Sequence, residues 1–407
     1  MPFLWGLLTV ALAPIVPTLF ALMLVLATIF ALLLAFACDK NRMFNYSPVN
    51  KYILLFAFVY LFATFTSVTF WGSLFSGMLT TVFIIFAVIL INSVKSRREL
   101  DILISAFVVS GALVSAYGVY QYFFGTFNPA AWLDADMFAG IGLRVTSTLD
   151  NPNVLAKYLL LVIPFAAACM INAKSGIVRL FYAGCLAFML ACLVLTFARG
   201  GWLGLIASAA VFFILIDRRF ILVGIIGLIV LYFTLPEVIL DRFFSIGDLD
   251  DTSTAFRFFI WVGTVAMLRD FWFTGIGPGV EAFTSIYPLY SLHTIITPHS
   301  HMLYLQIIVS AGFAGIAMFL IILFSYFRYM FTAVSKEIKT NSEDKSLKIL
   351  QFAAISSIFG FLIQGFTDYS FYNYRVTLVF WIVIGIGVLL SGRTMLSKGE
   401  TYNDKSS

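Results

Sequence analysis

The chain has 407 residues, of which 61% are hydrophobic and 11% are charged, and its formal net charge is +5. This composition excludes a soluble globular domain, because the apolar surface would exceed any core that such a domain could build. Apolar runs of roughly 20 residues, the length of a helix that crosses a bilayer, recur along the chain. The sequence therefore predicts an all-α, polytopic membrane protein, with residues 1–407 as a single integral membrane domain.

About twelve transmembrane helices are expected from the apolar runs. Pro14 and Pro17 separate the first two, so residues 2–13 form either a short spanning helix or a re-entrant one. The predicted helices cover residues 2–13, 17–37, 52–69, 71–93, 101–123, 154–172, 178–197, 202–216, 220–235, 302–327, 348–366 and 375–391.

The connections between these helices differ in charge. One alternating set carries 18 of the 25 lysines and arginines, whereas the other set is richer in acidic residues. Because loops rich in lysine and arginine stay in the cytoplasm, both termini are predicted to be cytoplasmic. The opposite, extracytoplasmic side then holds two substantial loops, at about residues 124–153 and 236–300.

The large loop at residues 236–300 is predicted to contain its own helix, which begins near Ser253 as N-cap and ends at about Leu268. Apolar residues recur on it at helical spacing and predict a helix that lies along the membrane surface or caps the helices beneath. That apolar face consists of Phe258, Trp261, Val265 and Leu268. The glycine-rich stretch from Thr274 to Gly279 then breaks the helix.

The outer side carries few basic residues, and most of them are arginines. Arginine offers a planar fork of donors that suits phosphate, so the set favours anion binding, although single arginines can also extend to lipid headgroups or pair with Asp241 or Asp270. Asn151 and Asn153 either help to bind sugar or phosphate or simply cap a helix. The outer basic residues are Arg144, Lys157, Arg199, Arg242, Arg257, Arg269 and Arg375.

Three histidines, His293, His299 and His301, lie within nine residues of the large loop. Histidine exchanges a proton near neutral pH, as the attack of a hydroxyl group requires. His299 and His301 offer only two ligands to a metal, with no third at recognisable spacing, so no metal site is predicted. Asp368, at the outer end of the eleventh helix, either supports a histidine or pairs with Arg375.

Taken together, these motifs resemble the O-antigen ligase and polymerase family, over about residues 140–390. The stretch from Thr196 to Trp202 is similar to the family's Ser/Thr–x–x–Arg–Gly–x–Trp motif, and residues 275–279 resemble the end of its large outer loop. His301, followed by Gly312 and Gly315, matches the spacing of the family's histidine and Gly–x–x–Gly. Met302 stands where the family usually has a polar residue, whereas His299 is followed by Ser300. The glycine spacing favours His301.

The resemblance implies a membrane glycosyltransferase of the bacterial cytoplasmic membrane that acts in cell-surface polysaccharide synthesis. Its donor would be an undecaprenyl-diphosphate-linked oligosaccharide, and its acceptor lipid A core, a growing polysaccharide or a protein hydroxyl. Membrane lipids are expected as partners, with no nucleic acid, no cofactor and no metal. His301 and Asp368 would be catalytic at the extracytoplasmic side. The diphosphate would be held by Arg199 and Arg257, with Arg144, Arg242 and Arg375. The alternative is a polytopic transporter of a lipid-linked or anionic substrate.

Overall fold

The structure is a computed structural model that describes residues 1–125, 143–234, 236–245, 247, 252–339 and 344–392. Within these ranges the chain forms helices and no strand. Nine of the described helices are long and apolar enough to cross a membrane, and three more apolar helices are shorter. The predicted fold class, an all-α polytopic membrane protein, is thereby confirmed.

The first half of the bundle is built from seven helices in chain order. Their bounds are α1 Pro2–Leu12, α2 Thr18–Cys38, α3 Asn50–Phe65, α4 Phe70–Ser93, α5 Arg97–Phe124, α6 Pro152–Asn172 and α7 Gly176–Leu195. With 11 residues, α1 is only about 16 Å long, roughly half the thickness of a bilayer core. The choice between a spanning and a re-entrant form of this short helix stays a prediction. Its Thr9 lies 3.3 Å from Thr28 of α2, hydroxyl to hydroxyl.

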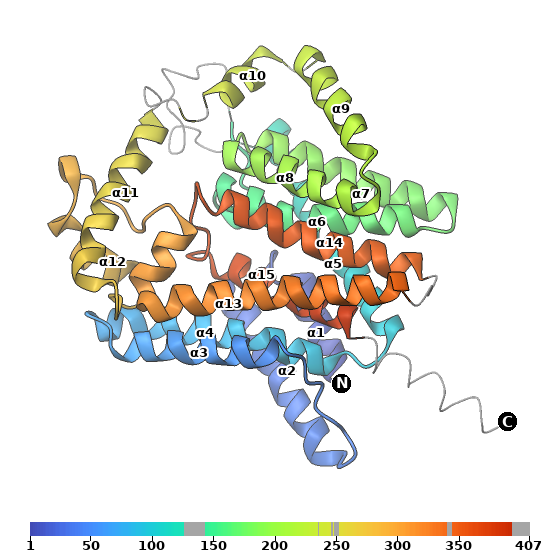
Figure 1. Cartoon of the computed structure of the whole chain (residues 1–407), viewed down its shortest axis with the longest axis horizontal. Helices are drawn as coiled ribbons and strands as arrows, with labels where there is room; N and C mark the ends of the chain where they lie inside the picture. The colour runs from blue at the N-terminus through green and yellow to red at the C-terminus, as the bar shows by residue number, and fades with distance from the viewer. Residues whose placement is uncertain (126–142, 235, 246, 248–251, 340–343, 393–407) are drawn as a thin grey trace.

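The second half holds the outer loop and α15, the most deeply buried of the described spans. Their bounds are α8 Arg199–Ile216, α9 Phe220–Thr234, α10 Glu237–Phe244, α11 Thr252–Phe271, α12 Val280–Ile286, α13 Leu303–Lys339, α14 Lys345–Gln364 and α15 Tyr374–Ser391. Figure 1 shows α13 and α14 running along the bundle, with α11 and α12 at the left end and α9 and α10 above it. Small residues allow the tight packing of α8 on α14, because Gly204 and Gly360 meet backbone to backbone.

The predicted surface helix exists as α11, but its buried side differs from the predicted one. Ile260, Thr264 and Met267 face inward, and Ile260 and Met267 pack with residues such as Tyr287 and Val309. Phe258 and Val265, from the predicted apolar face, are 46% and 53% exposed. Because this helix is apolar on two sides, its sequence does not reveal which side meets the protein. Ser253 lies in the first turn of α11, not at an N-cap before it.

Helix α13 is broken within its first third, at Ala311 and Gly312. Gly312 has a φ of +64°, and a Cβ there would lie 1.9 Å from the carbonyl oxygen of Phe273. Backbone groups of residues 272–277 pair with the break through three hydrogen bonds, Ile276 N to Val309 O, Gly277 N to Ser310 O and Phe313 N to Trp272 O. A break in an apolar helix is tolerated where other protein groups form hydrogen bonds with the backbone groups that the break leaves unpaired. The break at Gly312 therefore depends on the glycine-rich segment that follows α11.

Candidate functional site

A cavity of about 570 Å³ opens at the end of the bundle where α6, α8, α13 and α15 begin and α7 and α14 end. Its polar lining comes from segments far apart in the sequence. Six of the seven predicted site residues line this one cavity: Arg144, Arg199, Arg242, Arg257, His301 and Asp368.

Arg144 is held by the turns that surround the start of α6. Its Nε donates to the carbonyl oxygen of Thr196 at 2.8 Å, and its Nη2 donates to Oδ1 of Asn153 at 3.1 Å. Asn151 is the N-cap of α6, since its side chain accepts from the backbone N–H groups of Asn153 and Val154. The predicted helix cap is therefore Asn151, whereas Asn153 orients an arginine of the cavity, and the binding of sugar or phosphate by either residue stays a prediction.

Arg199 is the first residue of α8 and links this helix to the end of α10. Its Nη1 donates to the backbone oxygen and the hydroxyl of Ser245, at 2.8 and 2.9 Å. A Cβ on Gly200 would lie 2.3 Å from Oγ1 of Thr367, and a Cβ on Gly201 would lie 2.7 Å from that of Ala156. The two glycines therefore let the start of α8 approach α6 and the segment after α14 closely.

The arginines of the cavity influence one another electrostatically. Arg144, Arg199 and Arg242 are buried, and Arg257 is partly buried on α11. Burial, together with the positive charges of Arg242, Arg257 and Arg199, lowers the pKa of Arg144 to about 9. Cations gathered in a partly buried cavity raise one another's energy, and a bound anion would relieve that repulsion.

His301 and Asp368 lie next to each other in the lining of the same cavity. Nδ1 of His301 lies 3.7 Å from Oδ1 of Asp368, slightly beyond hydrogen-bond length. Oδ2 of Asp368 accepts from the Ser370 hydroxyl at 3.2 Å. Burial alone would raise the pKa of Asp368, but the neighbouring His301 and Lys157 outweigh it and hold the pKa below its ordinary value. The carboxylate is therefore ionised beside the imidazole.

Lys157 belongs to this arrangement, although the sequence analysis named it only as one of the outer basic residues and gave it no role in the site. It is fully buried in α6, its Nζ donates to the backbone oxygen of Asp368 at 2.9 Å, and it lies 4.9 Å from the centre of the Phe361 ring. The available signal was its position four residues after Asn153, on the same helix face. Lys157 fixes the segment that carries Asp368 and compensates its charge.

Arg375 is the predicted site residue that does not line the cavity. Its Nη2 lies 2.7 Å from Oδ2 of Asp150, whose side chain is 84% exposed. The alternative pairing of Arg375 with Asp368 is not what the structure contains, since Asp368 faces His301 instead. Within the described ranges, no group of three histidine, cysteine or acidic side chains is arranged to hold a metal ion.

Residues 184–320 match the family model described as O-antigen ligase, and no curated protein matches the chain. The matched segment contains Arg199, Arg242, Arg257 and His301 from the cavity, together with the broken start of α13. The match supports a membrane glycosyltransferase of the O-antigen ligase type. The resemblance to the O-antigen ligase family is thus confirmed, through residues 184–320 of an all-α polytopic membrane protein.

Proposed function

We propose that the protein transfers an oligosaccharide from undecaprenyl diphosphate to an acceptor hydroxyl at the extracytoplasmic face of the bacterial cytoplasmic membrane. The observation that carries this proposal is that Arg144, Arg199, Arg242 and Arg257 line the same cavity as the His301–Asp368 pair. A donor headgroup of this kind places two phosphates next to the sugar carbon that reacts. The cavity offers cations for the phosphates and an imidazole for the acceptor within one space.

The arginines would act on the leaving group. As the bond between the anomeric carbon and the diphosphate oxygen breaks, the electron pair leaves with the diphosphate, and the negative charge on it grows. Fixed guanidinium groups in a partly buried cavity stabilise such developing charge more than water does. Arg144 and Arg199 are already held by Thr196, Asn153 and Ser245, so little reorganisation is needed.

His301 would act on the acceptor. Its Nδ1 faces Asp368, which favours the tautomer with the proton on Nδ1 and the lone pair on Nε2. Nε2 would then take the proton of the acceptor hydroxyl as the oxygen forms its bond to the anomeric carbon. Asp368 would stabilise the imidazolium that results. A separation of 3.7 Å is compatible with this role, because such contacts often tighten when substrate binds.

The side of the membrane follows from the charge of the connections. The basic connections meet at the other end of the bundle, where Arg97 pairs with Asp344 at 3.4 Å and Asn172 binds the backbone of Ser346. The positive-inside rule places that end in the cytoplasm, which leaves the arginine cavity outside and both termini inside. In this orientation the cavity faces a donor that has already crossed the membrane.

The position of the buried charges also separates this proposal from the transporter alternative. Ion-coupled transporters place ionisable side chains near the middle of the membrane. In the described part of the chain, the buried charged residues lie at the end of the bundle that carries the cavity: Arg144, Lys157, Arg199, Arg242, Asp368 and Arg375. This placement favours a reaction at the membrane surface.

The proposal is tested with purified protein, an undecaprenyl-diphosphate-linked oligosaccharide and candidate acceptors. A new glycosidic bond, with release of undecaprenyl diphosphate in equal amount, is the expected result. The size distribution of the product distinguishes transfer to a finished acceptor from polymerisation. Movement of the intact lipid-linked glycan across proteoliposomes, with no new bond, would instead favour the transporter.

A further inference from the structure

The turn that carries His301 is held in place by side chains rather than by helix geometry. His301 has a φ of +52°, in the left-handed region that a non-glycine residue adopts only where its surroundings impose it. The backbone N–H of His301 donates to Nδ1 of His299 at 3.2 Å, and the N–H of Ser300 donates to Oε1 of Gln306 at 2.7 Å. The hydroxyl of Thr297 donates to the backbone oxygen of His299.

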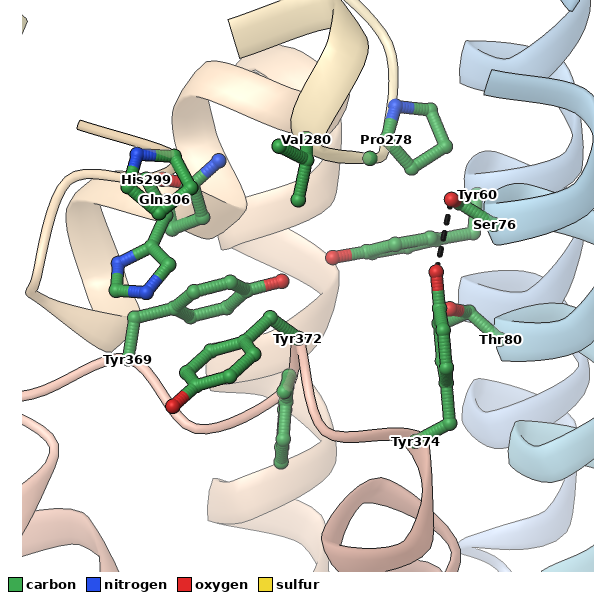
Figure 2. Close-up of a pocket in the computed structure, with 13 residues that line it drawn as sticks. Tyr60, Ser76, Thr80, Pro278, Val280, His299, Gln306, Tyr369, Tyr372 and Tyr374 are labelled. Carbon is green, nitrogen blue, oxygen red and sulfur yellow. Dashed lines mark hydrogen bonds between the residues drawn. The ribbon is translucent and has the colours of Figure 1, made fainter. Parts of the chain in front are cut away.

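His299 is itself fixed by aromatic side chains. Its ring stacks on Tyr372 with the centroids 4.7 Å apart and an interplanar angle of 19°, and it meets Tyr369 edge to face at 5.4 Å. These residues form one end of a small chamber of about 40 Å³ that shares His299 and Tyr372 with the large cavity, and Tyr60 and Tyr374 lie at its other end (Figure 2). His299 is only 5% exposed, so its ring has little freedom to turn.

We propose that His299 is a positioning residue, which stays neutral and holds the backbone of His301 through its Nδ1 lone pair so that the imidazole of His301 faces Asp368. The predicted effect of His299 on turnover rests on the proposed function. The predicted protonation state and tautomer of His299 do not. An N–H donor to Nδ1 requires that the ring proton of His299 lie on Nε2. The two neighbouring histidines would thus have opposite tautomers and different tasks.

The charged groups around His299 support its neutral state. Among the residues that the structure describes, Asp368 is the anion that acts on His299, and it is opposed by Lys157 of α6, Arg257 of α11 and His301 in its own turn. The groups stacked on it from the segment after α14, Tyr369 and Tyr372, are uncharged phenols. Burial first, and His301 second, lower the pKa of His299 to about 3. Protonation would also remove the acceptor that holds His301.

The state of His299 can be measured without any assay of activity, because the chain has only three histidines. Nitrogen-15 spectra of the histidine-labelled protein in lipid should contain one ring that carries its proton on Nε2 and does not titrate between pH 5 and 8. The signals of that ring should be the ones that disappear in His299→Asn. A ring of His299 that titrates in this range, or that carries its proton on Nδ1, would overturn the proposal.

Turnover measurements then test the positioning role with two matched variants. In His299→Asn the side-chain oxygen can take the place of Nδ1 as acceptor, whereas His299→Leu fills the space with no acceptor. Displacement of a reacting group by about 1 Å can cost about 100-fold in rate. We expect a kcat loss of about that size in the leucine variant, with the affinity for undecaprenyl diphosphate unchanged, and recovery to within a few-fold of the wild type in the asparagine variant.

The two experiments separate the failure of this inference from the failure of the proposed function. Equal turnover in His299→Leu and the wild type, or equal losses in both variants, would overturn the positioning role. If the wild-type protein forms no glycosidic bond, the proposed function fails, while the nitrogen-15 spectra still decide the state of His299. A leucine variant that fails to fold is recognised by its loss of lipid diphosphate binding. In that case the nitrogen-15 spectra of the wild type decide whether His299 is neutral with its proton on Nε2.

Discussion

Replacement of Asp368 by asparagine removes the charge that faces His301 while it keeps the shape of the side chain. In the proposed reaction His301 becomes positively charged when it takes the proton of the acceptor. Two unit charges at the observed separation of 3.7 Å attract each other by about 4 kcal/mol at an effective dielectric constant of about 20. Because a tenfold change in rate corresponds to about 1.4 kcal/mol, Asp368→Asn should lower kcat by about 100- to 1000-fold.

The assay is transfer of glycan from a saturating amount of undecaprenyl-diphosphate-linked donor, with donor affinity measured separately. The affinity should not fall in Asp368→Asn, because the variant leaves every arginine of the cavity in place. Asp270→Asn is a suitable control, since Asp270 is an exposed carboxylate of the same outer loop that accepts from Tyr290. A kcat of Asp368→Asn within threefold of the wild type would refute the electrostatic role of this carboxylate.

Further predictions concern the arginines, the glycine of the broken helix and pH. Arg199→Lys keeps a charge but loses the planar fork, so the donor Kd should rise by about tenfold, as measured by titration with undecaprenyl diphosphate. Inorganic pyrophosphate, by relieving the repulsion around Arg144, should raise Tm in a thermal scan, by the equivalent of about 2.7 kcal/mol at 100 times its Kd; no shift would speak against an anion site. Gly312→Ala should destabilise the protein by about 3 kcal/mol or more and lower Tm, because its Cβ would meet a carbonyl oxygen at 1.9 Å. The control Gly224→Ala, with no atom within 4 Å of the added Cβ, should leave Tm unchanged or raise it. Since the pKa of Asp368 is lowered on folding, its contribution to stability is present above the unfolded value of about 3.9 and lost below it. The difference in stability between the wild type and Asp368→Asn should therefore shrink as the pH falls below about 4.

The helices were predictable because a single property, the length of the apolar run, decides them. The predicted span at residues 178–197 and the observed α7, Gly176–Leu195, differ by two residues at each end. Helix α13 is the exception, since it continues to Lys339, and its break at Gly312 depends on hydrogen bonds to a segment more than 30 residues earlier in the chain. A pattern of apolar residues contains no information about such a partner.

The site was predictable as a set of residue types, but not as a set of contacts. Arginines on the outer side work against the charge rule for membrane loops, and this conflict identified Arg144 and Arg199 before any geometry was known. The partner of Arg375 could not be predicted, because Asp150, Asp368 and phosphate are equally plausible for an isolated arginine. The burial of Lys157 depends on the segment that folds back from the end of α14 over the start of α6.

In the proposed function, one outward-facing cavity binds the donor diphosphate and activates the acceptor with different side chains. The most direct measurement compares donor affinity and turnover in Arg257→Ala and His301→Ala. We predict a weaker donor affinity in the arginine variant, and an unchanged affinity with loss of turnover in the histidine variant. Turnover at the wild-type rate in His301→Ala, or equal loss of donor binding in both variants, would contradict this account.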